Sequence, residues 1–178
     1  MTENMAGSRF RAARTARQTH EVVMDTVKLL VFSQDPNRPA IGTKDLNSCT
    51  AVAIVSPYAA ILAHIPPQPY PTDDPNLGMW NVQSRMNGVI HLYHHNRAYF
   101  PPNRTYSIVV GGTYNSDFVL YDQVKQIRDM LRQNHLEPMM KVYEVHLNGH
   151  ASPAQGTVFI DARSGSPIVF VEDEIISG

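Results

Sequence analysis

Two short apolar runs separated by a turn constrain the fold of this chain more than any other feature. Residues 49–55 read CTAVAIV and residues 59–65 read AAILAHI, with Ser56-Pro57-Tyr58 between them. The runs are short, and the first is rich in β-branched side chains, so both are predicted to be strands. The tripeptide between them favours a turn. The pattern therefore predicts an antiparallel β-hairpin.

The other apolar segments divide into strand patterns and helix patterns. Strands are predicted in five further segments: 22–32, 106–110 (ending at Gly111-Gly112), 139–147, 156–162 and 167–173. Apolar residues at helical spacing predict helices over 77–98 and 117–135, with Asp117 as the cap of the second. Strands outnumber helices and neighbouring strands are linked as hairpins, so the pattern predicts an α+β fold with helices covering one side.

Length and charge exclude several classes of protein. The chain has 178 residues and a net charge of −1, which suits one domain and gives no overall attraction to nucleic acid. No apolar run approaches the roughly 20 residues that cross a bilayer, so no membrane insertion is expected. Cys49 has no partner for an internal disulfide, which indicates a reducing compartment and a cytoplasmic location.

The N-terminus differs from the remainder in charge. Residues 5–18 carry four arginines and no acid. This composition predicts a basic, flexible tail over residues 1–20, followed by a single domain over residues 21–178. A targeting peptide is the alternative, although Glu3 and the lack of a clean apolar face count against it.

Cys49 stands where a polar loop gives way to the first strand of the hairpin. A nucleophilic thiol needs a nearby base, and a reactive one is expected to have a lowered pKa. If the hairpin turns about residue 57, Cys49 faces residue 65 and lies next to His64. A one-residue bulge would then bring both side chains to the same face. A small buried cysteine and a satisfied core histidine remain the alternative interpretation.

Five motifs in order resemble one known family. They are TKDLNSCTAV (43–52), ILAHIPP (61–67), VVGGT (109–113), HLNGH (146–150) and TVFIDARSGSPIVFV (157–171). Together they resemble the CheD-type chemoreceptor glutamine deamidases, which are related to the catalytic domains of cytotoxic necrotizing factor-type toxins. The resemblance covers about residues 25–173. It implies sandwich-like mixed and antiparallel sheets with two main helices on one side, in three layers.

The resemblance also implies an activity and a set of residues. Cys49 would attack the side-chain amide of a protein glutamine, with His64 as base and Thr43 orienting the imidazole. The reaction needs no cofactor. Because a hydroxyl orients an imidazole less strongly than a carboxylate, loss of Thr43 is expected to cost less than loss of the other two.

The same loops are expected to line the substrate site. The backbone N–H groups of Ser48 and Cys49 are candidates for stabilising the oxyanion, although Ser48 is equally consistent with a plain turn residue. Asn47 replaces a glycine of the family, and it is expected to take the left-handed backbone in its place. Gly112 is expected to border the pocket. A protein bearing a reactive glutamine is the expected partner.

Two other possibilities stay open at the level of sequence. His91, His94 and His95 lie on one predicted helix, and His91 with His95 has a spacing that metal ligands use. Leu92 stands where an HExxH motif has glutamate, so a polar helix face is favoured and no metal site is predicted. The function could instead be a non-enzymatic binding module of the same fold, or a thiol hydrolase acting on a small amide or ester.

Overall fold

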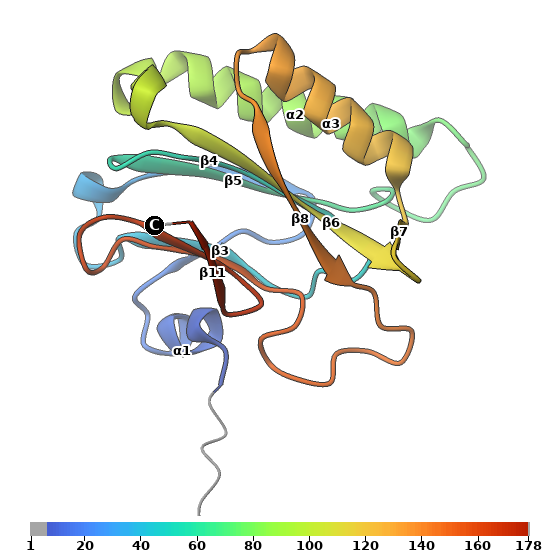
Figure 1. The fold of residues 1–178 in the computed structure, drawn as a ribbon, viewed down its shortest axis with the longest axis horizontal. Coiled ribbons are helices and arrows are strands. Elements are labelled where there is room, and N and C mark those ends of the chain that lie inside the picture. Colours follow the sequence, from blue (N-terminus) through green and yellow to red (C-terminus); the bar gives the residue numbers. More distant parts are fainter. Residues whose placement is uncertain (1–6, 178) are drawn as a thin grey trace, which may run out of the picture.

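The computed structural model describes residues 7–177, which fold into two stacked β-sheets with helices on the outside (Figure 1). The six-stranded sheet contains β2 (Thr26–Val31), β5 (Ala59–Ile65), β4 (Thr50–Val55), β6 (Tyr106–Tyr114) and β7 (Asp117–Phe118), with β8 (Pro138–Glu144) also paired to β6. The five-stranded sheet contains β1 (His20–Glu21), β3 (Ala40–Thr43), β9 (Val158–Asp161), β10 (Ile168–Val171) and β11 (Glu174–Ser177). The predicted α+β, sandwich-like class is confirmed.

The predicted hairpin is present as β4 and β5, which pair from Thr50 with Ile65 to Val55 with Ala60. Every residue of both strands is buried because the hairpin has a core on each face. Successive side chains of a strand point to opposite faces. Ala51 and Ala53 therefore face the second sheet, while Val52 and Ile54 face the helices.

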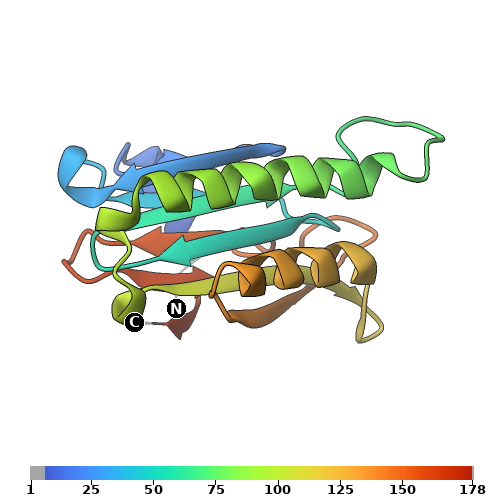
Figure 2. The ribbon, with the colours of Figure 1, turned by 90° about the horizontal axis from the view of Figure 1, so that it is seen from above.

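Two long helices cover the outer face of the six-stranded sheet. These are α2 (Leu77–His95) and α3 (Tyr121–Gln133), which lie side by side over it (Figure 2). α3 joins β6 to β8, and these two strands are parallel, as expected for strands joined by a helical crossover. Short 3-10 turns occur at Phe32–Gln34, Arg97–Tyr99 and Pro102–Arg104. No helix within residues 7–177 is long and apolar enough to cross a membrane.

Two predicted boundaries are wrong for identifiable reasons. β6 does not end at Gly111-Gly112 but continues to Tyr114, because β8 pairs with it along this length. Asp117 does not cap α3, because it pairs with Tyr114 in β7 across a turn at Asn115 and Ser116. Both turn residues have positive φ, which permits the tight reversal.

Four strands were not predicted: the two-residue strands β1 and β7, and the longer strands β3 and β11. β3 consists of the four residues AIGT inside a polar loop, and β11 is a short strand at the end of the described chain. Neither is long enough to show a clear apolar period. β3 matters most, because Thr43 is its last residue.

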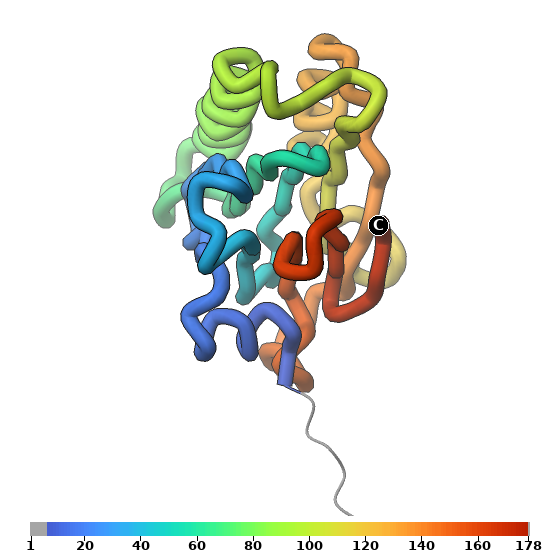
Figure 3. Tube along the Cα trace, turned by 90° about the vertical axis from the view of Figure 1, so that its left-hand side faces the viewer, coloured from blue at the N-terminus to red at the C-terminus, as the bar shows by residue number. Residues whose placement is uncertain are grey.

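The prediction of a flexible tail is wrong for the described residues from Arg9 onward. Residues Arg9–Thr15 form α1, which Figure 3 shows on the side of the sandwich away from α2 and α3. Phe10 is fully buried, and its ring centroid lies 5.8 Å from that of Phe159. Phe10 and Ala13, one helical turn apart, form the short apolar face that holds the helix on the sheet. Residues 1–6 lie outside the described part.

Candidate active site

Thr43 and His64 meet in the interior between the two sheets. Thr43 Oγ1 lies 2.7 Å from His64 Nδ1 and 2.7 Å from the carbonyl oxygen of Val22. A carbonyl only accepts hydrogen bonds, so the Thr43 hydroxyl donates its single hydrogen to Val22. Its oxygen must then accept a hydrogen from Nδ1. This network assigns His64 the neutral tautomer whose Nε2 carries the free lone pair.

The Nε2 atom of His64 is buried and has no hydrogen-bond partner within residues 7–177. Burial lowers the pKa of His64 to about 4, and the nearby acids Asp45 and Asp25 only partly oppose this effect. The imidazole is therefore neutral at neutral pH, with an acceptor that the protein leaves unused. Such an acceptor is what a general base requires.

Cys49 lies on the same face of the six-stranded sheet as His64. His64 pairs with Ala51, and the observed register is one residue later than the predicted one, with Thr50 rather than Cys49 opposite Ile65. Cys49 lies two residues before Ala51 and belongs to the same core between the sheets. The two side chains thus share a face without the predicted bulge. No hydrogen bond joins Cys49 Sγ to His64 in the described chain.

The thiol of Cys49 is protonated at neutral pH. Burial raises the pKa of Cys49 to about 11, and a hydrogen bond from the Asn47 backbone opposes this only in part. The expectation of a lowered pKa is therefore wrong for this geometry, because no cation among residues 7–177 offsets the effect of burial. Cys49 and His64 are therefore both neutral at neutral pH.

His64 lines a surface pocket of about 290 Å³. Its walls come from residues 21–24 and from Lys44 and Asp45. Val23 and Met24 are exposed on this rim, with 53% and 58% of their surface accessible. His64 thus lies beside a surface pocket with an apolar rim. Cys49 does not line this pocket.

The loop between Thr43 and Cys49 is fixed by its polar side chains. The side-chain amide of Asn47 donates to the carbonyl oxygen of His146 at 3.1 Å and accepts from its N–H at 3.1 Å. The left-handed residues of this loop are Asp45 and Ser48, with φ of 61° and 78°. The expectation that Asn47 replaces a left-handed glycine is therefore wrong. Asn47 instead clamps the loop, and Ser48 makes the turn into Cys49.

Sequence reasoning missed Tyr143, which holds the backbone of Cys49. The Tyr143 hydroxyl donates to the carbonyl oxygen of Cys49 at 2.6 Å. Gly112 pairs with Tyr143 across β6 and β8, and a Cβ on Gly112 would lie 3.0 Å from that hydroxyl. Gly112 is buried and makes room for Tyr143 rather than lining the pocket at His64. A glycine inside a strand is a signal of such close approach.

The histidines of α2 lie away from this site. The rings of His91 and His95 stack with centroids 3.8 Å apart on an exposed face, and His94 Nε2 lies 2.7 Å from Asn134 Oδ1. Within residues 7–177, no group of three or more histidine, cysteine, aspartate or glutamate side chains is placed to hold a metal ion.

Comparisons with known proteins give little further information. No family model matches the chain, and no curated protein matches it. Among solved structures, it is similar to the hypothetical protein YfiH of Bacillus licheniformis, with 12% sequence identity and a TM-score of 0.34. The match covers 71% of this chain and 59% of that one, so this chain matches less than two thirds of the YfiH length.

Proposed function

We propose that this protein is a cysteine-dependent amidohydrolase that converts glutamine side chains of a partner protein to glutamate. The observation that carries the proposal is the buried, unpartnered Nε2 of His64 on the same sheet face as Cys49. Thr43 holds the His64 ring in the tautomer whose Nε2 is free to accept a proton. The resemblance of the five ordered motifs to CheD-type deamidases supports glutamine as the substrate.

The chemistry follows from the neutral state of the pair. His64 Nε2 removes the thiol proton as Cys49 Sγ attacks the amide carbon, which gives a tetrahedral oxyanion and an imidazolium. The imidazolium then gives its proton to the amide nitrogen, and ammonia leaves as the thioester forms. Water, deprotonated by the same nitrogen, hydrolyses the thioester to glutamate and restores the thiol. No net proton or electron is needed from elsewhere.

One movement must accompany this reaction. The sulfur of Cys49 has to come within hydrogen-bonding distance of Nε2, and rotation about its Cα–Cβ bond is the smallest change that alters their separation. Hydrogen bonds between catalytic groups are often absent before substrate binds. Tyr143 and Asn47 hold the backbone around Cys49 in place while its side chain rotates. The Ser48 and Cys49 N–H groups stay our candidates for the oxyanion donors.

The surroundings of the pair favour a protein substrate over a small one. The exposed apolar side chains of Val23 and Met24 border the pocket that reaches His64, and such side chains suit contact with a protein surface. A single free thiol also suits the cytoplasm, where thiols remain reduced. We therefore place the partner among cytoplasmic proteins.

Proteome-wide mass spectrometry tests this proposal. An extract of cytoplasmic proteins is incubated with the wild-type protein or with Cys49→Ala, and glutamines converted to glutamate are mapped. Ser164→Ala, in the exposed turn between β9 and β10, serves as the matched control. We expect conversion of specific glutamines by wild type and Ser164→Ala but not by Cys49→Ala. Equal conversion in all three samples would contradict an amidohydrolase.

A further inference from the structure

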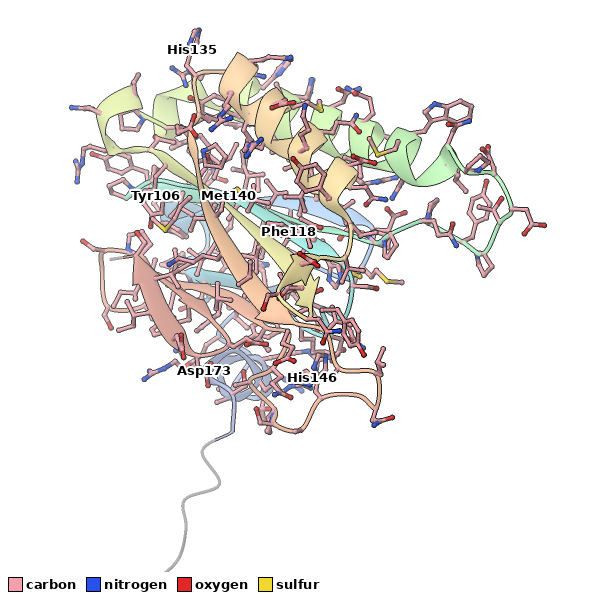
Figure 4. The ribbon with its side chains drawn as sticks, turned by 45° about the vertical axis from the view of Figure 1, so that its right-hand side comes forward. Tyr106, Phe118, His135, Met140, His146 and Asp173 are labelled. Carbon is pink, nitrogen blue, oxygen red and sulfur yellow. The ribbon has the colours of Figure 1, made fainter. Side chains whose placement is uncertain are left out.

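A second cavity lies at the other end of the molecule from Cys49. It has a volume of about 370 Å³ and lies where the C-terminal ends of α2 and α3 meet the start of β6. Figure 4 shows His135 and His146 at opposite ends of β8. His135 lines the cavity, whereas the backbone of His146 binds Asn47 in the Cys49 loop. The volume is within the range of small-molecule sites. The mechanism proposed above uses none of its residues.

The floor of this cavity contains an unsatisfied hydroxyl. Ser107 is 1% exposed, and its Oγ has no hydrogen-bond partner in the part of the chain that the structure describes. Val109, two residues along β6, belongs to the core under the helices, so Ser107 faces that side as well. A buried hydroxyl without a partner destabilises the fold, because it has lost its hydrogen bonds to water and gained none in return. This cost is removed if a ligand in the cavity bonds to it.

Basic groups surround the mouth. The Arg97 guanidinium lies 4.6 Å from the centre of the Tyr93 ring and donates to the Tyr93 hydroxyl. It makes no ion pair with any carboxylate of residues 7–177, so most of its N–H donors are available. His94 and His135 line the same mouth. An arginine of this kind, fixed by stacking on an aromatic ring, is suited to binding a carboxylate or phosphate.

The carboxylate and two of the carbonyl groups near the mouth already have partners within the protein. Glu137 lines the cavity, but Arg132 binds both of its carboxylate oxygens, with Nε to Oε2 at 2.8 Å. The carbonyl ends of α2 and α3 also point toward this region, where they would disfavour an anion. The side-chain amides of Asn96 and Asn134 cap the carbonyls of Leu92 and Met130, each at 2.8 Å.

We propose that this cavity binds a small organic anion, with its carboxylate or phosphate between the Ser107 hydroxyl and the Arg97 guanidinium. The organic part would contact Tyr93 and Leu136, which form apolar walls. The volume exceeds what an inorganic ion alone would fill. The cavity lies on the helix side of the six-stranded sheet, whereas Cys49 lies between the sheets. This site is therefore separate from the proposed catalytic pair.

Calorimetric titration of the full chain at neutral pH tests this assignment. The probes are benzoate, phenyl phosphate and neutral benzamide, which share a ring and differ in charge. We expect at least one of the two anions to bind tenfold or more tightly than benzamide. Benzoate and phenyl phosphate distinguish a carboxylate from a phosphate ligand. Equal affinity for all three probes, or no binding at all, would overturn the proposal.

Variants of two lining residues test whether the anion binds in this cavity. Arg97→Gln and Ser107→Ala should each weaken binding of the better anion at least fivefold. Arg104→Gln removes the same charge from an exposed arginine that stacks on Tyr58 outside the cavity, and it should change affinity less than twofold. Arg97 is exposed, so its variant tests the site even if Ser107→Ala disturbs folding. Equal losses in Arg97→Gln and Arg104→Gln would mean nonspecific charge attraction and would overturn the site.

Discussion

The Thr43 hydroxyl has one hydrogen to donate, and the carbonyl oxygen of Val22 takes it. The oxygen of the same hydroxyl is therefore left to accept from His64, which gives a threonine the orienting role that a carboxylate often has. A carboxylate would stabilise an imidazolium, whereas a hydroxyl leaves the imidazole neutral. A threonine as the partner of His64 is therefore consistent with the lowered pKa of His64.

Replacement of Thr43 tests this role directly. Thr43→Val keeps the shape of the side chain but removes both hydrogen bonds, so the imidazole loses its fixed tautomer. We expect kcat to fall by about tenfold to a hundredfold, with KM little changed. Thr43→Ser retains the hydroxyl and should restore most of the loss. The rates are measured on a glutamine found in the proteome comparison, and equal rates for Val and Ser variants would contradict the orienting role.

Alkylation of Cys49 tests its protonation state. With a pKa of about 11 against an ordinary 9.0, the thiolate fraction at pH 8 is on the order of a hundredfold lower than in a free cysteine. The iodoacetamide rate should therefore be low at neutral pH and still rise above pH 10. His64→Ala should leave it within about twofold, because no hydrogen bond joins His64 Nε2 to the thiol before substrate binds. A fast reaction at pH 7 that collapses in His64→Ala would instead indicate a thiolate–imidazolium pair.

Among the elements, β6 and β8 position Cys49 through one glycine and one tyrosine. Tyr143 lies across Gly112 and reaches the carbonyl of Cys49. The sequence showed Gly111-Gly112 as the end of a strand, although the pair lies inside one. The parallel pairing with β8 that extends the strand depends on residues about thirty positions away. Local patterns cannot show a contact of that range.

Substitution at these two positions should be strongly coupled. Gly112→Ala places a methyl group against the Tyr143 ring and should destabilise the protein by about 1–3 kcal/mol. Tyr143→Phe leaves the Cys49 carbonyl without its donor, at a cost of about 1–3 kcal/mol. The double variant should lose less than the sum, because the alanine has already displaced the hydroxyl. Urea unfolding measures the three values, and strict additivity would show that the residues act independently.

At the scale of the whole molecule, the sequence predicted the parts whose pattern is local. The central hairpin and both long helices were found because their apolar periods are long enough to be recognised. The strand that carries Thr43 was missed, because four residues in a polar loop show no period. The meeting of Thr43 and His64 was expected from the resemblance alone, and it depends on the packing of two separate sheets.

The burial of His64 between the sheets makes the stability of the whole molecule depend on pH. Its pKa is about 4 when folded, against an ordinary 6.5. Above pH 6.5 the group is neutral in both states. Between pH 6.5 and 4 the unfolded chain binds a proton that the folded chain does not, so stability falls as the pH falls, by about 3 kcal/mol at most.

A variant without the titrating group isolates this contribution. The free energy of unfolding is measured for wild type and His64→Gln at several pH values between 7 and 4. The stability of wild type relative to the variant should decrease by about 3 kcal/mol over this range. A difference that stays constant would mean that His64 titrates alike in both states.

Nitrogen NMR of His64 tests its role as a base without a substrate, because it reports the tautomer and the pKa of the ring. We expect a proton on Nδ1, none on Nε2, and a neutral ring down to about pH 4. Thr43→Val should lose the preference for this tautomer. A wild-type spectrum with the proton on Nε2, or a titration near pH 6.5, would contradict His64 as the free base beside Cys49.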